Sequence, residues 1–186
     1  MRLLAKLLFF RKDFLTESVT AWGGTVYFPS AAWCRTHPDL AWQGLAHALV
    51  HVSDYHRVTP PVYALSYLFP QCLAPLAVGA FWHSWMGLFL LALLPWPAPF
   101  RKHWEVRATA MTMATEVWQG RPLSEPPEEA LHRLAGPRYY WCWPYRDALR
   151  RELHRWLVSI KARKLGLFIA HTTDVKFAIR IESVLR

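Results

Sequence analysis

The chain reads Leu-Ala-His-Ala-Leu-Val-His-Val-Ser-Asp at positions 45–54, within a segment whose apolar residues recur at helical spacing. We expect one helix from Asp39 to Tyr55, with Pro38 in its first turn. On such a helix, His47 and His51 project from the same face, close enough to bind one metal ion through their imidazole nitrogens. Pairs of histidines at this spacing also arise by chance, so the surrounding residues must decide.

Two acidic residues complete the predicted metal site. Asp54 lies one turn beyond His51, where its carboxylate could accept the second ring N–H and fix the tautomer. A third ligand should come from another helix. Glu105 is the only acid between Asp54 and Glu116, and it lies near the start of a second expected helix, from about His103 to Trp118. The alternative is that the histidines are core or surface residues and that Glu105 forms a salt bridge.

A long uncharged segment separates the two expected helices. No Asp, Glu, Lys or Arg occurs from Val62 to Trp96, and prolines interrupt the segment. One membrane-spanning helix needs about 20 apolar residues, so the segment is long enough for two legs. We expect a helical hairpin that dips into a membrane. The alternative is a soluble hairpin buried in the core of the chain or against a partner.

The charge and the cysteines of the chain indicate its partner and its cellular compartment. The formal net charge is +9, and the basic residues gather in Met1–Lys12 and from Arg146 onward. No nucleic-acid-binding motif accompanies them, so we expect an anionic lipid surface rather than a nucleic acid as partner. The three cysteines, Cys34, Cys72 and Cys142, lie far apart without metal-binding spacing, which indicates a reducing, cytoplasmic compartment. Met1–Lys12 is expected as an amphipathic helix or a buried first turn rather than a signal peptide.

The two motifs resemble those of a known family. His-Ala-Leu-Val-His at 47–51 is similar to the HExxH helix of zinc metallopeptidases, and Glu-Val-Arg-Ala at 105–108 resembles the glutamate motif of their gluzincin branch. A short β-prone run, Gly24 to Phe28, resembles the edge strand that precedes this helix. The likeness covers about residues 20–118. It is strongest to small membrane-associated peptidases of phage and bacterial type and more distant to HtpX-type membrane peptidases, from which Thr109 departs.

The resemblance implies an α+β, mainly helical, zincin-like fold with a short edge strand, a metal-binding helix, an apolar hairpin and a second ligand helix. It implies Zn²⁺ held by His47, His51 and Glu105, with a fourth position open to water. A protein or peptide substrate would lie as an extended strand along the edge strand. The residues of that strand that would contact it are Thr25, Val26, Tyr27 and Phe28.

Position 48 departs from the family pattern. The family has there a glutamate that takes a proton from water, whereas this chain has Ala48, whose methyl group cannot move a proton. We therefore expect a zinc-dependent endopeptidase that is inactive in this chain. Because the other motif elements survive, a substitution introduced into an active enzyme is favoured. The alternative is a natural, metal-stabilised pseudoenzyme that serves as a structural or docking component of a viral or membrane assembly.

The chain is expected to have two parts. Residues 1–120 would form the metallopeptidase core, including the apolar hairpin 62–96, and residues 121–186 a basic, aromatic-rich extension packed on it. Membrane lipid or another protein would cover the hairpin, and an oligomer is compatible with either. We expect a membrane-associated protein on the cytoplasmic side, of phage or viral type.

Overall fold

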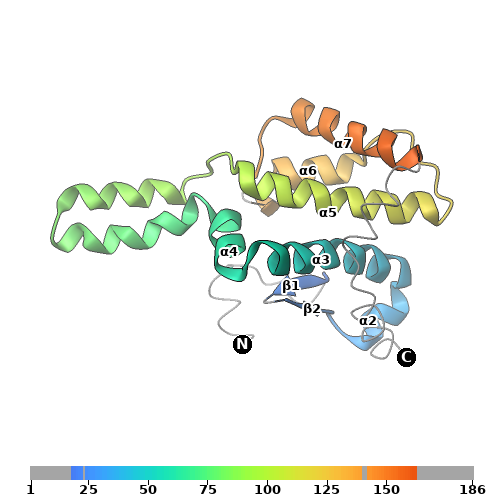
Figure 1. Ribbon diagram of the computed structural model, residues 1–186, viewed down its shortest axis with the longest axis horizontal. Coiled ribbons are helices and arrows are strands. Elements are labelled where there is room, and N and C mark those ends of the chain that lie inside the picture. Colours follow the sequence, from blue (N-terminus) through green and yellow to red (C-terminus); the bar gives the residue numbers. More distant parts are fainter. Residues whose placement is uncertain (1–17, 23, 140–141, 163–186) are drawn as a thin grey trace.

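The computed structural model describes residues 18–22, 24–139 and 142–162 (Figure 1). These residues form a mainly helical α+β fold with one small sheet, as the sequence predicted. In chain order the elements are β1 (Thr20–Trp22), β2 (Thr25–Tyr27), α2 (Ala31–Thr36), α3 (Pro38–Val58), α4 (Pro60–Leu68), the 3-10 helices η1 (Gln71–Phe81) and η2 (Ser84–Leu93), α5 (Pro99–Trp118), α6 (Glu128–Ala135), the short 3-10 helix η3 (Pro137–Tyr139) and α7 (Arg146–Lys161). The helix expected at Met1–Lys12 lies outside the described residues.

Helix α3 carries the two histidines and is longer than predicted. It begins at Pro38, whose fixed backbone suits a first turn, and it continues three residues past Tyr55 to Val58. Its end is set by the chain that follows. Thr59 has φ 79° and precedes Pro60, and a residue before proline is disfavoured in helical conformation. The break turns the chain directly into α4.

The two strands form an antiparallel hairpin beside α3. Sequence analysis predicted one strand from Gly24 to Phe28. The structure has β2 at Thr25–Tyr27 and pairs it with β1, which the sequence did not reveal. Gly24, with φ 77°, makes the turn, and a Cβ at this position would lie 2.9 Å from the imidazole of His56. At the other end of the strand hairpin, Val19 lies against α3, where a Cβ on Gly44 would be 2.6 Å from its side chain. The hairpin therefore runs along α3 past the turns that carry both histidines.

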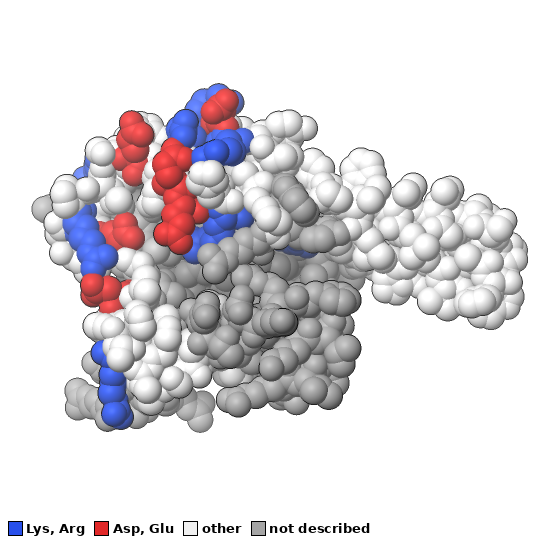
Figure 2. Space-filling view, turned by 180° about the vertical axis from the view of Figure 1, so that it is seen from behind, with Lys and Arg blue, Asp and Glu red and all other residues white. Residues whose placement is uncertain are grey.

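The uncharged segment is helical, as predicted, and it is divided among α4, η1 and η2. The last two pair as a hairpin that projects from the body of the molecule (Figure 1) and carries no Lys, Arg, Asp or Glu (Figure 2). Its large apolar side chains are exposed, so the alternative of a hairpin buried within its own chain is wrong. No single described helix is long and apolar enough to cross a bilayer. Only α4 and η1 together meet that criterion, and they are bent by 84°.

Helix α5 holds the body together. It begins at Pro99, four residues before the predicted start, and lies between α3 on one side and α6 and α7 on the other (Figure 1). The main buried cluster fills the second of these contacts, where α5 contributes Val106 and Met113. Leu131 of α6 and Leu153 of α7 are fully buried against them. The described part of the segment after residue 120 therefore shares a core with the second ligand helix.

Candidate metal centre

The structure brings His47, His51 and Glu105 together. Nε2 of His51 lies 3.2 Å from Nε2 of His47. Nε2 of His47 lies 3.4 Å from Oε2 of Glu105, and Nε2 of His51 lies 3.5 Å from Oε1. Two nitrogens and a carboxylate from two helices thus face one point, and this cluster could hold a metal ion. All three residues were predicted from the sequence.

Packing between α3 and α5 sets this convergence. Val50 of α3 is buried against Ala108 and Met111 of α5, and Ala46 lies at the edge of the same cluster. Alanines at the contact allow the two helix backbones to approach closely. Glu105 lies one turn before Ala108, and the same packing therefore carries its side chain to the histidine face of α3.

Two tyrosines of α4 complete the surroundings of the cluster. The hydroxyl of Tyr63 lies 2.9 Å from Nδ1 of His51, the ring nitrogen opposite the one that faces the cluster. The hydroxyl of Tyr67 donates a hydrogen bond to Oε1 of Glu105. Sequence reasoning missed both residues because they lie in the segment assigned to an apolar hairpin. Their spacing of one helical turn, which matches that of the histidines, was the available signal.

Two hydrogen bonds fix α4 on α5. Nε1 of Trp104 donates to Oγ of Ser66 over 3.1 Å, and Nε of Arg101 donates to the backbone oxygen of Tyr67 over 2.8 Å. Both donors precede Glu105 in α5. The face of α4 that carries the tyrosines is therefore held against the turn of α5 that supplies the third ligand.

Asp54 does not have the predicted role. Its Oδ1 accepts a hydrogen bond from Nη1 of Arg107 over 2.7 Å, and both side chains are buried. The outer nitrogen of His51 is hydrogen-bonded with the hydroxyl of Tyr63 instead. A guanidinium is the stronger partner for a carboxylate, because both groups are charged. Burial raises the pKa of Asp54, and Arg107 opposes that rise. Asp54 therefore joins α3 to α5 rather than orienting a metal ligand.

The electrostatic state of the cluster suits a cation. Burial lowers the pKa of His51 to about 4, so its imidazole is neutral near pH 7. Burial raises the pKa of Glu105, but the facing His51 and His47 outweigh it and hold the pKa at about 2. The carboxylate is therefore ionised although it is only 1% exposed. Its Oε2 accepts no hydrogen bond within the described part of the chain. A buried anionic oxygen in that state is costly without a positive partner.

Ala48 is buried beside the cluster, at 2% exposure. It lies one turn after Gly44, on the side of α3 that faces the strand hairpin. Its methyl group can neither accept nor deliver a proton, and the two acids at the contact of α3 and α5 have other partners. Glu105 belongs to the cluster itself, and Asp54 is bound to Arg107.

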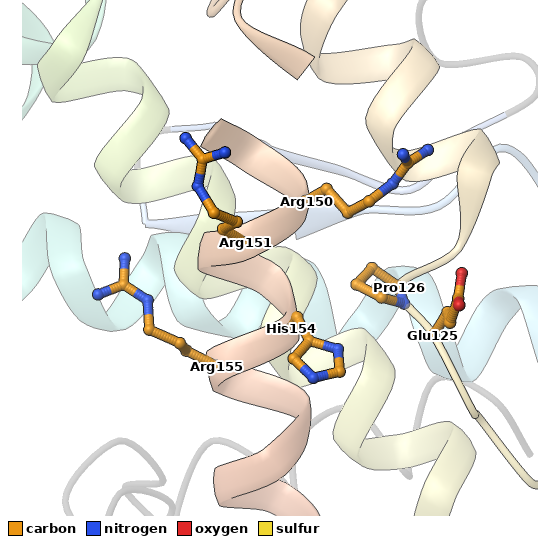
Figure 3. A pocket seen from close by; sticks show the side chains of 6 residues that line it. All are labelled: Glu125, Pro126, Arg150, Arg151, His154 and Arg155. Carbon is orange, nitrogen blue, oxygen red and sulfur yellow. The ribbon is translucent and has the colours of Figure 1, made fainter. Parts of the chain in front are cut away.

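A separate hollow of about 680 Å³ lies away from this centre, at α7 (Figure 3). Its lining consists of Glu125, Pro126, Arg150, Arg151, His154 and Arg155. Arg151 and Arg155 point to one side of α7, and Arg150 points to the other, where it pairs with Glu128 of α6 (Figure 3). The hollow contains none of the cluster residues, and we assign it no part in the metal centre.

Comparison with known proteins adds no family to these residues. No protein-family model, no curated protein and no solved structure matches the chain. The function of the cluster must therefore be inferred from its ligand atoms and from the residues around them.

Proposed function

We propose that this chain is a zinc-binding protein of the HExxH metallopeptidase type that has lost its general base at Ala48. The observation that supports this most directly is the convergence of His47, His51 and Glu105 from two helices. The chain would hold zinc and an extended peptide without cleaving the peptide. The family assignment is part of the proposal and rests on these residues and on the order of the motifs along the chain.

The spacing of the ligand atoms fits zinc. For bond lengths of about 2.0–2.1 Å in tetrahedral geometry, neighbouring ligand atoms lie about 3.3–3.4 Å apart. The three distances here are 3.2, 3.4 and 3.5 Å. Imidazole nitrogen and carboxylate oxygen are also ordinary zinc ligands. In this type of site, zinc polarises a carbonyl and makes bound water acidic.

The residues of the chain would prepare this site in three ways. Tyr63 would orient His51, and Tyr67 would orient the carboxylate of Glu105. The imidazoles of His47 and His51 keep 18% and 11% of their side-chain surface exposed, which leaves one side of the cluster open to solvent or to a peptide. The buried side is closed by α5. This division into a closed and an open side is typical of catalytic rather than structural zinc sites.

A peptide would bind beside the strand hairpin. The described sheet has only two strands, so β2 keeps one edge without a strand partner. This hairpin lies along α3 between Gly44 and His56, past the turns that carry the histidines. Backbone hydrogen bonds to an edge strand bind an extended chain with little dependence on its sequence. We therefore propose a protein or peptide as the ligand.

A second function has one observation in its favour. The exposed apolar hairpin of η1 and η2 is far larger than a metal site requires. A metal-stabilised pseudoenzyme that docks into a membrane or viral assembly would use such a surface. Both functions need the metal, and they differ in whether a glutamate at position 48 creates peptidase activity.

Metal analysis of the purified chain tests the shared part of both functions. We expect stoichiometric zinc in the unsubstituted protein and its loss in His51→Ala. His56→Ala is the matched control, since this histidine lies on the same helix and is exposed. Equal zinc content in His51→Ala and the unsubstituted protein would contradict the assignment of the ligands.

A further inference from the structure

We propose that the hairpin of η1 and η2 enters one leaflet of a lipid bilayer and holds the body of the protein at the membrane surface. This inference is independent of the metal site. It concerns the residues from Gln71 to Leu93, which project from the helical body (Figure 1).

The hairpin exposes its largest apolar side chains. Phe81 is 89% exposed and Trp82 is 77% exposed at the tip, where Trp85 follows at 61%. Further residues of this kind continue along both legs, at Leu76, Val78, Leu88, Leu90, Leu91 and Leu93. Monomeric soluble proteins rarely leave so much contiguous apolar surface in water, so some apolar phase must cover this one.

The two legs come close to each other at two glycines, one of which lies against Met86. A Cβ at Gly79 would lie 2.4 Å from the side chain of Met86, and one at Gly87 would lie 3.8 Å from Ala80. Small residues at such a contact let helices approach closely, as they do within membranes. A water-soluble hairpin has the opposite arrangement, because it turns its large apolar residues inward.

The distribution of exposed residues favours lipid over a protein partner. A 3-10 helix has three residues per turn, so positions three apart share one side. In η2, one side holds Trp85, Leu88 and Leu91, and a second side holds Leu90 and Leu93; all five are exposed. The third side, with Met86, faces η1, and Gly87 of the second side also lies against η1. Protein partners or a second copy typically cover one face of such a helix, whereas acyl chains surround it.

Length and charge fit shallow insertion. Eleven residues of 3-10 helix extend about 20 Å at about 2.0 Å per residue, less than the roughly 30 Å of the hydrocarbon core. The tip can therefore enter the bilayer without crossing it. No Asp, Glu, Lys or Arg lies between Val62 and Trp96, and Trp96 at the base has the preference of tryptophan for the headgroup level. The net charge of +9 adds attraction to anionic lipid.

Vesicle flotation of the full chain tests this inference. We expect the unsubstituted protein to float with neutral phosphatidylcholine vesicles at high salt. Trp82→Asp should reduce the bound fraction by at least about tenfold, because it removes an apolar anchor and places a charge in the bilayer. Trp118→Asp is the matched control: Trp118 is 54% exposed at the end of α5, and its substitution should leave flotation unchanged.

Several outcomes would overturn the proposal. They are no flotation with any vesicle, unchanged flotation of Trp82→Asp, and flotation only with vesicles containing phosphatidylglycerol that is abolished by salt. A dimer in sedimentation that Trp82→Asp dissociates, without lipid binding, would assign the surface to a second copy. Circular dichroism verifies that each variant is folded. Zinc content, which the proposal expects to be unaffected by Trp82→Asp, separates this test from that of the metal site.

Discussion

The hydroxyl of Tyr63 lies 2.9 Å from Nδ1 of His51, while Nε2 of the same ring faces His47 and Glu105. A neutral imidazole that binds metal through Nε2 carries its proton on Nδ1. Burial, with a further contribution from Glu105, raises the pKa of Tyr63, so its side chain remains a phenol whose oxygen can accept that proton in a hydrogen bond. Tyr63 can therefore accept the Nδ1 proton of the tautomer that directs a lone pair at the metal position.

Tyr63→Phe should weaken zinc binding about 10- to 100-fold, the usual effect of losing an outer partner of a metal-bound histidine. The fold should tolerate the change, because the aromatic ring and its contacts with Tyr67 and Trp104 remain. Competition with a chromophoric chelator measures the affinity. Tyr55→Phe is the control, since this ring also contacts Tyr63. An affinity equal to that of the unsubstituted protein would contradict the role given to the hydroxyl.

Glu105→Gln should distinguish the stability of the metal-free chain from the stability that zinc adds. Without metal, the lowered pKa of Glu105 means that the folded chain favours the ionised carboxylate, so the substitution should lower Tm in chelator. Tyr67 can still donate to the amide oxygen. With zinc at 100 times its Kd, the unsubstituted protein should gain about 2.7 kcal/mol in free energy of unfolding, and the variant should lose this gain.

Thermal unfolding with zinc and with chelator gives both values. Glu116→Gln, on the same helix but bound to Gln43, should keep the zinc-dependent increase in Tm. If Glu105→Gln retained the increase, this carboxylate would not be a ligand.

Asp54→Ala should destabilise the protein by about 3 kcal/mol or more, because it removes the carboxylate that compensates the buried guanidinium of Arg107. Asp39→Ala is the contrasting variant. Asp39 also pairs with an arginine, Arg121, but both are exposed, and such pairs contribute about 0–1 kcal/mol. Urea unfolding measures both. Equal effects would mean that the buried pair is not a tie between α3 and α5.

The metal cluster could be predicted from helical spacing and from the scarcity of acids between the two helices. The spacing of His47 and His51 on one helix fixes their common face, and Glu105 was the only acid available in a long stretch. Helix α3 and helix α5 were predicted for the same reason, with errors of a few residues at their ends. The resemblance to zinc peptidases also predicted the order of the ligand residues along the chain. That order agrees with the cluster, but the cluster does not test the family assignment.

The partners of the cluster could not be predicted, because they depend on packing between distant elements. Asp54 is in helical register with His51, yet Arg107 lies 53 residues away and binds it more strongly. Tyr63 and Tyr67 reach the site only because Thr59 and Pro60 turn α4 back along α3. Strand β1 has three residues and no strong alternation of apolar and polar side chains. Only its pairing with β2 defines it as a strand.

Ala48→Glu decides between the enzyme and the docking module. Ala48 is 2% exposed and lies on the side of α3 toward the strand hairpin, so a glutamate there would be buried near the candidate zinc position. Both residues favour helix, but a buried carboxylate needs a compensating charge. We therefore expect Ala48→Glu to lower Tm in chelator and to recover most of that loss with zinc.

If the chain is a peptidase without its general base, zinc-loaded Ala48→Glu should cleave members of a peptide library. Ala48→Gln is the control, since it has nearly the same shape and cannot accept the proton; its rate should be about 10²- to 10⁴-fold lower. Mass spectrometry of the products, with and without chelator, measures the activity. If a folded, zinc-loaded Ala48→Glu protein cleaved nothing, the peptidase function would be wrong, because the general base would then be present without any activity. The docking function would remain.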